Sequence, residues 1–186
     1  MDTRRIVLAI TGATGAILGV RLLEELNKQP VETHVVISPW GEKTIALETD
    51  YSLSEVEELC DHVYQHDDMA ASLSSGSFRV GEMVICPCSM KTLASIAHGY
   101  AGNLIVRSAD VALKERRRLI LVPRETPLHY GHLENMMKLH SYGAVIAPPM
   151  PAFYFGPQNI EDLVNHFTGR ILDLLNLEHN LCERWG

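Results

Sequence analysis

The chain has 186 residues, of which 46% are hydrophobic and 21% charged, and this composition excludes a disordered or collagen-like protein. The length suits one domain, which we expect to span residues 1–186. Sixteen Lys and Arg against 23 Asp and Glu give a formal charge of −7. A net negative chain repels nucleic acid and anionic lipid, so we expect neither as a partner. Four scattered cysteines do not form a disulfide framework, which favours a reducing cytoplasm.

Apolar residues dominate positions 6–20 after Arg4 and Arg5, in a pattern similar to a secretory signal. However, the turn at 11–15 divides this run, and helical periodicity continues to Leu26. We therefore interpret the segment as a strand, a turn and a helix. No other window approaches the ~20 apolar residues of a membrane span, so we expect no membrane association.

Short apolar runs alternate with segments of helical periodicity along the chain. The predicted strands are 6–10, 34–37, 83–86, 119–122 and 144–147. The predicted helices are 17–26, 43–47, a segment opened by a Ser54/Glu57 capping box, 92–97, 109–117, 133–139, and 160–175 behind an Asn159 cap. Such alternation favours parallel strands with right-handed crossovers. We therefore predict an α/β fold, an open doubly wound parallel sheet in a Rossmann-like or flavodoxin-like three-layer sandwich.

Ligands of such sheets bind beyond the carboxyl ends of the strands. In this chain those ends carry small, hydroxyl-bearing or basic residues, which are typical of an anion and cofactor site. They are 11–16 after the first strand, Ser38 after the second, 87–89 after the third, Arg124 and Glu125 after the fourth, and a proline-rich turn leading to Tyr154 after the fifth.

The turn at 11–15 places backbone amides at a helix N-terminus, where anions bind. It does not read G-x-G-x-x-G, so a plain tight turn remains an alternative. An NAD-binding domain usually has Asp or Glu at the end of its second strand. This chain has Ser38 there, which disfavours NAD and favours a mononucleotide such as FMN.

Four basic residues, Arg107, Lys114, Arg124 and Arg170, make up a quarter of all Lys and Arg. Arg107 and Lys114 are two helical turns apart and would face one way on a continuous helix. Periodicity alone also allows Lys114 to be a solvated helix end. Arg124 directly follows a buried strand at the ligand edge, so we predict a second anion site, for a phosphate.

Patterns for metal ions and for other chemistries are weak. Cys86-Pro87-Cys88 is not C-x-x-C, and strand alternation would place one thiol in the core and the other at the strand end. His129 and His132 are interpreted as a cap or surface pair rather than metal ligands. There is no repeated acidic motif for magnesium and no G-x-S-x-G elbow. We expect no metal.

Several motifs together resemble one family, the UbiX-like flavin prenyltransferases, and above all the members associated with phenolic or aromatic acid decarboxylases. The motifs are Thr-Gly-Ala-Thr-Gly-Ala (11–16), Glu-Thr-Asp (48–50), Cys-Pro-Cys-Ser-Met-Lys-Thr-Leu (86–93), Ala-Asp-Val-Ala-Leu-Lys-Glu-Arg-Arg (109–117), Val-Pro-Arg-Glu-Thr-Pro (122–127), Pro-Ala-Phe-Tyr (151–154) and Arg184-Trp185. They follow the family's order and span nearly the whole chain.

This resemblance implies a single flavoprotein domain with a flavodoxin-like fold, bound FMN and no metal. Family members transfer a dimethylallyl group from dimethylallyl monophosphate to N5 and C6 of reduced FMN. The prenylated FMN then serves a separate UbiD-like aromatic acid decarboxylase. The family forms homododecamers with sites between subunits, so the resemblance also implies that assembly.

The resemblance further assigns roles to individual positions. Those for FMN are Gly12, Ala13, Thr14, Ser38, Cys88, Ser89, Met90, Lys91 and Arg124. Those for the prenyl phosphate are Tyr154 and Arg170, with Arg107 and Lys114 near them as catalytic cations. Fixed cations would stabilise the departing phosphate without a metal. Glu48 and Glu125 match the acidic catalytic positions, and either could accept a proton from N5 or C6 if burial tunes its pKa.

Two other functions remain open at this point. The chain could be an FMN-dependent decarboxylase that acts directly on aromatic or phenolic acids. It could also be a non-catalytic flavin carrier that delivers the cofactor to a partner.

Overall fold

A computed structural model describes residues 3–182, so Arg184 and Trp185 lie outside the described residues. The strands are β1 (Arg4–Ile10), β2 (Val31–Ile37), β3 (His62–Tyr64), β4 (Glu82–Cys88), β5 (Arg118–Pro123) and β6 (Val145–Ile146). The helices are α1 (Ala16–Leu26), α2 (Pro39–Glu48), α3 (Leu53–Glu58), α4 (Met90–Ala97), α5 (Leu104–Lys114), α6 (Tyr130–Ser141) and α7 (Ile160–Leu174), with a short 3-10 turn, η1 (Ser72–Ser74).

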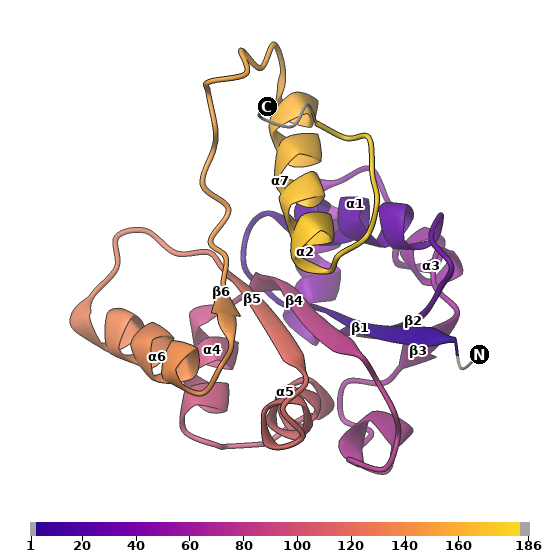
Figure 1. Cartoon of the computed structure of the whole chain (residues 1–186), viewed down its shortest axis with the longest axis vertical. Coiled ribbons are helices and arrows are strands. Elements are labelled where there is room, and N and C mark those ends of the chain that lie inside the picture. Colours follow the sequence, from indigo (N-terminus) through magenta and orange to yellow (C-terminus); the bar gives the residue numbers. More distant parts are fainter. Residues whose placement is uncertain (1–2, 183–186) are drawn as a thin grey trace.

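The strands form one parallel sheet in the order β3-β2-β1-β4-β5-β6, which confirms the predicted fold (Figure 1). Strand β3 was missed by the sequence prediction. The five predicted strands alone would have the flavodoxin order, and the addition of β3 at the edge gives the Rossmann order. In both orders, the strands before β4 are added to one side of β1, and the strands from β4 onward are added to the other side. Ligands of such folds bind at this switch point, between β1 and β4.

Helices cover both faces of the sheet (Figure 1). Because side chains alternate along a strand, Ile6 and Leu8 of β1 point into a core with α1 and α7, whereas Val7 and Ala9 point into a core with α4 and α5. All four side chains are almost fully buried. The two helical layers are therefore separated by the sheet, which matters for the basic residues they carry.

Several predicted helix starts shift because a polar side chain caps the helix earlier. The capping box of α3 is Ser52 with Glu55, not Ser54 with Glu57. Ser89 caps α4 and His129 caps α6, so these helices begin before positions 92 and 133. The cap role considered for His129 is confirmed. The predicted cap of α7 is also confirmed, since Asn159 Oδ1 accepts from the Asp162 N–H at 2.9 Å.

The two thiols of β4 lie on opposite faces of the sheet, and Cys88 is the last residue of the strand, as predicted, but its thiol is buried in a core like that of Cys86. The pairing of β4 with β5 shifts register between Ile85 and Cys88, and such an irregularity reverses the alternation. Cys86 enters the core with α1, and Cys88 enters the core with α4. Both are buried, and burial raises the pKa of the Cys88 thiol to about 12.

Within residues 3–182, none of the helices combines the length and the apolar character needed to cross a lipid bilayer.

Candidate functional site

Hydrogen bonds hold the loops after four strands together at the carboxyl edge of the sheet. Thr11 is buried, and its Oγ1 donates to the Pro87 carbonyl and accepts from the Ser89 N–H, both at 2.8 Å. The Ser38 N–H donates to the Ile10 carbonyl at 3.0 Å, and the Arg124 N–H donates to Cys88 at 3.3 Å. The predicted convergence of these loops is therefore confirmed.

The residues that this network presents are suited to an anionic mononucleotide. Gly12, Thr14, Lys91 and Arg124 are exposed, and Ala13, Ser38, Ser89 and Met90 are partly exposed. Ser38 and Ser89 cap α2 and α4 by accepting from Gly41 N–H at 3.0 Å and Thr92 N–H at 3.3 Å. The positive ends of both helix dipoles therefore point to this edge, where hydroxyls and amides can bind phosphate.

Glycines allow the turn after β1 to pack closely. A Cβ added at Gly12 would lie 2.2 Å from the Cβ of Trp40 at the start of α2. Gly15 has a φ of +96°, in the left-handed region that favours glycine. The segment therefore forms the tight turn that the sequence left open as an alternative.

Glu48 occupies part of the anion position predicted in this turn. One carboxylate oxygen, Oε2, accepts from the N–H groups of Gly15 at 2.7 Å and Ala16 at 3.1 Å. Because these are the first amides of α1, Glu48 caps that helix from the end of α2. The amides of Gly15 and Ala16 are therefore taken by an internal carboxylate, and the anion site predicted in this turn is left to residues 12–14.

The two predicted catalytic glutamates are both exposed. Glu48 serves α1, and Glu125 Oε1 accepts from the neighbouring Thr126 N–H at 3.0 Å. The sequence prediction required both carboxylates to be buried, and in the single chain neither of them is. A partner or ligand that covers the two carboxylates would have to bury them.

Cys88 contributes to this edge with its backbone rather than its thiol. Its side chain is fully buried in the core against α4, while its carbonyl accepts from Arg124. A contact of Cys88 with the cofactor, which the resemblance implies, would therefore use its backbone.

Arg107 and Lys114 face the same segment of chain, as their spacing predicts. Arg107 Nε donates to the Ser74 carbonyl at 3.0 Å, and its guanidinium pairs with Asp110 at 2.6 Å. Lys114 Nζ would lie 2.7 Å from a Cβ added at Gly76, and it pairs with the neighbouring Glu115. Both cations belong to one face of α5 next to η1.

Tyr154 and Arg170 both lie next to His166, which was not predicted as a site residue. Tyr154 Oη lies 2.9 Å from His166 Nε2, and His166 is one turn before Arg170 on α7. Burial, followed by the charge of Arg170, lowers the pKa of His166. Arg170 itself is exposed and pairs with Asp173 at 2.7 Å. The spacing of His166 and Arg170 on one helix was the available signal.

The four basic residues singled out in the sequence do not meet within one chain. α5 lies on the face covered by α4, and α7 lies on the face covered by α1 (Figure 1). The sheet thus separates Arg107 and Lys114 from Arg170, while Arg124 lies at the carboxyl edge. The resemblance implies sites between subunits, so a shared site for these cations requires more than one copy of the chain.

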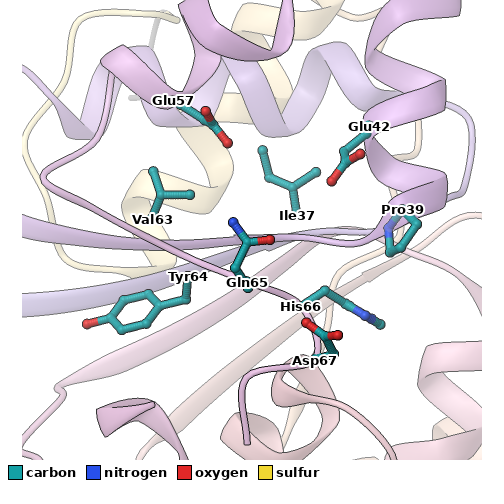
Figure 2. A pocket seen from close by; sticks show the side chains of 9 residues that line it. All are labelled: Ile37, Pro39, Glu42, Glu57, Val63, Tyr64, Gln65, His66 and Asp67. Atoms are coloured by element: carbon teal, nitrogen blue, oxygen red, sulfur yellow. The ribbon is translucent and has the colours of Figure 1, made fainter. Parts of the chain in front are cut away.

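A hollow beside this edge has the wrong charge for a phosphate. It lies near the ends of β2 and β3, and Figure 2 shows carboxylates around it. Its lining residues are Ile37, Pro39, Glu42, Glu57, Val63, Tyr64, Gln65, His66 and Asp67. Three carboxylates repel an anion, so this hollow does not fit the FMN phosphate.

Comparison with known proteins identifies the family. Residues 1–172 match a family model described as Flavoprotein. Flavin prenyltransferase LpdB of Lactiplantibacillus plantarum is 53% identical over 183 residues, which are 98% of each chain. This chain belongs to the UbiX-like flavin prenyltransferases.

Solved structures of UbiX-like proteins superimpose on this member over almost its full length. AnUbiX (PadA1), in complex with FMN and dimethylallyl pyrophosphate, has a TM-score of 0.98 at 55% identity and covers 100% of this chain and 98% of that one. A dodecameric protein of Escherichia coli O157:H7, described as an FMN-dependent UbiX-like decarboxylase, has a TM-score of 0.96 at 52% identity, with coverages of 98% and 99%.

Proposed function

We propose that this UbiX-like flavin prenyltransferase transfers a dimethylallyl group from dimethylallyl monophosphate to N5 and C6 of reduced FMN. The observation that carries the proposal is the near-complete match to a flavin prenyltransferase, together with hydroxyls and helix N-termini gathered at one sheet edge. The direct decarboxylase stays as a second candidate, since a 52% identical structure bears that description. We further propose that residues 1–186 form one flavoprotein domain.

The carboxyl edge would hold FMN through groups that suit its phosphate and ribityl chain. We assign this role to Gly12, Ala13, Thr14, Ser38, Ser89, Met90, Lys91 and Arg124, and to the backbone of Cys88. When bound, FMN supplies the nucleophilic positions that accept the dimethylallyl group. The Thr11 bonds to Pro87 and Ser89 fix the loop that carries three of these residues.

Loss of phosphate from an allylic ester leaves negative charge that must be stabilised in place. Arg107, Lys114 and Arg170 can neutralise it without a metal, and the Tyr154 hydroxyl can donate to a phosphate oxygen. In one chain the α5 cations and the Tyr154–Arg170 pair lie on opposite faces. We therefore propose that two copies of the chain complete the site.

Exposed apolar side chains support this assembly. Met150 and Phe153 precede Tyr154, and both are 71% exposed. Large apolar side chains exposed close together in the sequence favour a protein contact. The E. coli relative is dodecameric, and we propose the same homododecamer here.

Proton transfer would fall to Glu48 or Glu125. Either carboxylate can accept the proton that leaves the acceptor atom as the new bond forms. Glu48 already accepts two amides of α1, whereas Glu125 bonds only to its neighbouring amide among the described contacts. A second copy that covers the site would supply the burial that both lack.

We also propose that the product serves a UbiD-like aromatic acid decarboxylase. The cysteine content supports a reducing cytoplasm as the compartment.

Incubation of the purified protein with reduced FMN and dimethylallyl monophosphate tests the activity. We expect an FMN adduct heavier by one dimethylallyl group, with a changed absorbance spectrum, and the diphosphate serves as the comparison donor. Release of CO2 from a cinnamate or hydroxybenzoate by this chain alone would instead establish the decarboxylase. A flavin carrier would activate a partner decarboxylase equally well after Arg170→Ala, whereas the transferase loses that ability.

A further inference from the structure

Three metal-binding side chains lie side by side on β2 and β3, away from the carboxyl edge. Glu32 and His34 are two residues apart on β2, so they point to the same face of the sheet. His62 pairs directly with His34 across the two strands. This group was not predicted from the sequence, because it depends on the pairing of β3 with β2.

The three ligand atoms converge on a small volume. One donor atom from each residue lies within 4.8 Å of the other two. Glu32 Oε1 is 3.2 Å from His34 Nε2 and 3.1 Å from His62 Nε2. Atoms bound tetrahedrally to one zinc ion lie about 3.3–3.6 Å apart, so the two distances to Glu32 need only small adjustment, and the two imidazole nitrogens lie within 4.8 Å of each other.

His34 provides an independent indication of a ligand. Its side chain is 1% exposed, and Nε2 has no hydrogen-bond partner; its contact of 3.2 Å with Glu32 Oε1 is an ion pair only when the imidazole is protonated. A buried ring nitrogen without a partner is costly. A cation bound by Nε2 and the carboxylate would satisfy Nε2, and it would replace the hydrogen bond between His62 and Glu32.

The groups around His34 are arranged as outer partners of a metal ligand. Tyr64 Oη lies 2.9 Å from His34 Nδ1 and 3.2 Å from Ser72 Oγ. If Nδ1 donates to Tyr64 and Tyr64 donates to Ser72, the Nε2 lone pair faces Glu32. Histidine ligands in metal sites are usually oriented by such a bond from the other ring nitrogen.

The remaining neighbours define the charge and shape of this site. The ring of Phe78 packs edge-on against His34, with centroids 5.3 Å apart. Arg5 lies over Phe78 and donates to Glu32 Oε2 at 3.1 Å. Arg5 therefore holds the outer carboxylate oxygen, which leaves Oε1 directed at the histidines. Its positive charge also makes the site weaker than an all-anionic one.

We propose that Glu32, His34 and His62 form a binding site for a divalent first-row transition metal, with Zn²⁺ the best match to two imidazoles and one carboxylate. The fourth position belongs to water, since His62 is half exposed. The ion fastens the three-residue edge strand β3 to β2. It is separate from the proposed transferase site and has a structural role, because its ligands lie along the strands rather than beyond their ends.

Metal titration of tag-free, chelator-treated full-length protein tests this site. We expect one Zn²⁺ per chain by calorimetry, and Co²⁺ should give the intense visible absorption of a four-coordinate site. At a zinc concentration about a hundredfold above the dissociation constant, the thermal midpoint should rise by roughly 5–10 °C.

The decisive variant is His62→Gln, because this half-exposed edge residue can change without disturbing the core. We expect at least about tenfold weaker Zn²⁺ binding and loss of the Co²⁺ absorption. His140→Gln, at an exposed histidine of α6, is the matched control and should bind as the original chain does. Equal binding by His62→Gln and the original chain, or no saturable binding by the original chain, would overturn the proposal. In that case the three residues are two stacked imidazole rings with Glu32 hydrogen-bonded to His62.

Discussion

Thr11→Val tests the junction that joins β1 to the loop after β4. The substitution keeps the shape of the side chain and removes its hydroxyl. Two hydrogen bonds of 2.8 Å are lost, one to the Pro87 carbonyl and one from the Ser89 N–H. Pro87 keeps a bond of 3.2 Å from the Thr11 N–H, so the Ser89 N–H is the group left without a partner.

The expected cost follows from these two bonds. Each contributes about 0.5–1.5 kcal/mol net, and the partly buried Ser89 amide, once unpaired, adds part of the ~1–3 kcal/mol that a fully buried one costs. We therefore expect the free energy of unfolding to fall by about 2–3 kcal/mol. For a chain of this size that corresponds to a drop of roughly 4–12 °C in the thermal midpoint. FMN binding should weaken as well, because Ser89 begins the proposed cofactor loop.

Urea unfolding at fixed protein concentration, with FMN titration by fluorescence, measures both effects. Thr11→Ser is the matched control, since it retains the hydroxyl and loses only a methyl group. The serine variant should keep FMN affinity. A valine variant with the stability and FMN affinity of the original chain would refute the idea that Thr11 positions this loop.

Three further substitutions or conditions probe other parts of the structure. Glu48→Ala removes the acceptor of two α1 amides and should lower the free energy of unfolding by about 1 kcal/mol. Urea titration measures this loss, with Glu48→Gln, which keeps an acceptor oxygen, as the control. An equal loss of stability in both variants would argue against capping by Glu48. Gly19→Ala would place a Cβ 2.3 Å from the Cys86 carbonyl, so α1 must move off β4 and calorimetry should show a lower thermal midpoint; an unchanged midpoint would contradict that packing. Burial and Arg170 lower the pKa of His166, so the folded state binds fewer protons than the unfolded state, and the free energy of unfolding should fall as pH drops below about 6.5. His166→Asn should make that pH dependence shallower, and a dependence of the same slope would exclude His166 as its source.

Much of the fold follows from local patterns in the sequence. The apolar runs of the central strands are flanked by helical periodicity, and only a parallel sheet accommodates this order. The edge strand β3 escaped prediction because His62-Val63-Tyr64 is too short and too polar to stand out. Caps such as Asn159 were predictable, because the cap and its helix are adjacent in sequence.

Only the part of the site that lies at the strand ends was predictable from the sequence. Ser38, Ser89 and Arg124 converge because parallel strands end at one edge. The capping of α1 by Glu48 could not be foreseen, since it joins segments 33 residues apart in sequence. Likewise, the separation of Arg107 from Arg170 depends on which face each helix covers. The Glu32, His34 and His62 group depends on pairing with β3, the strand that was missed.

The most direct test of the central claim uses two variants, Arg107→Ala and Arg170→Ala. Each alone should fail to form the FMN adduct, because each lacks one half of the phosphate site. The two variants are then co-expressed with different tags, and the mixed oligomer is purified by both tags. If copies combine at random, about one quarter of the sites that two copies share have both arginines intact. The mixed oligomer should therefore regain about one quarter of the original activity. A mixed oligomer as inactive as either variant would contradict a site completed by two copies of the chain.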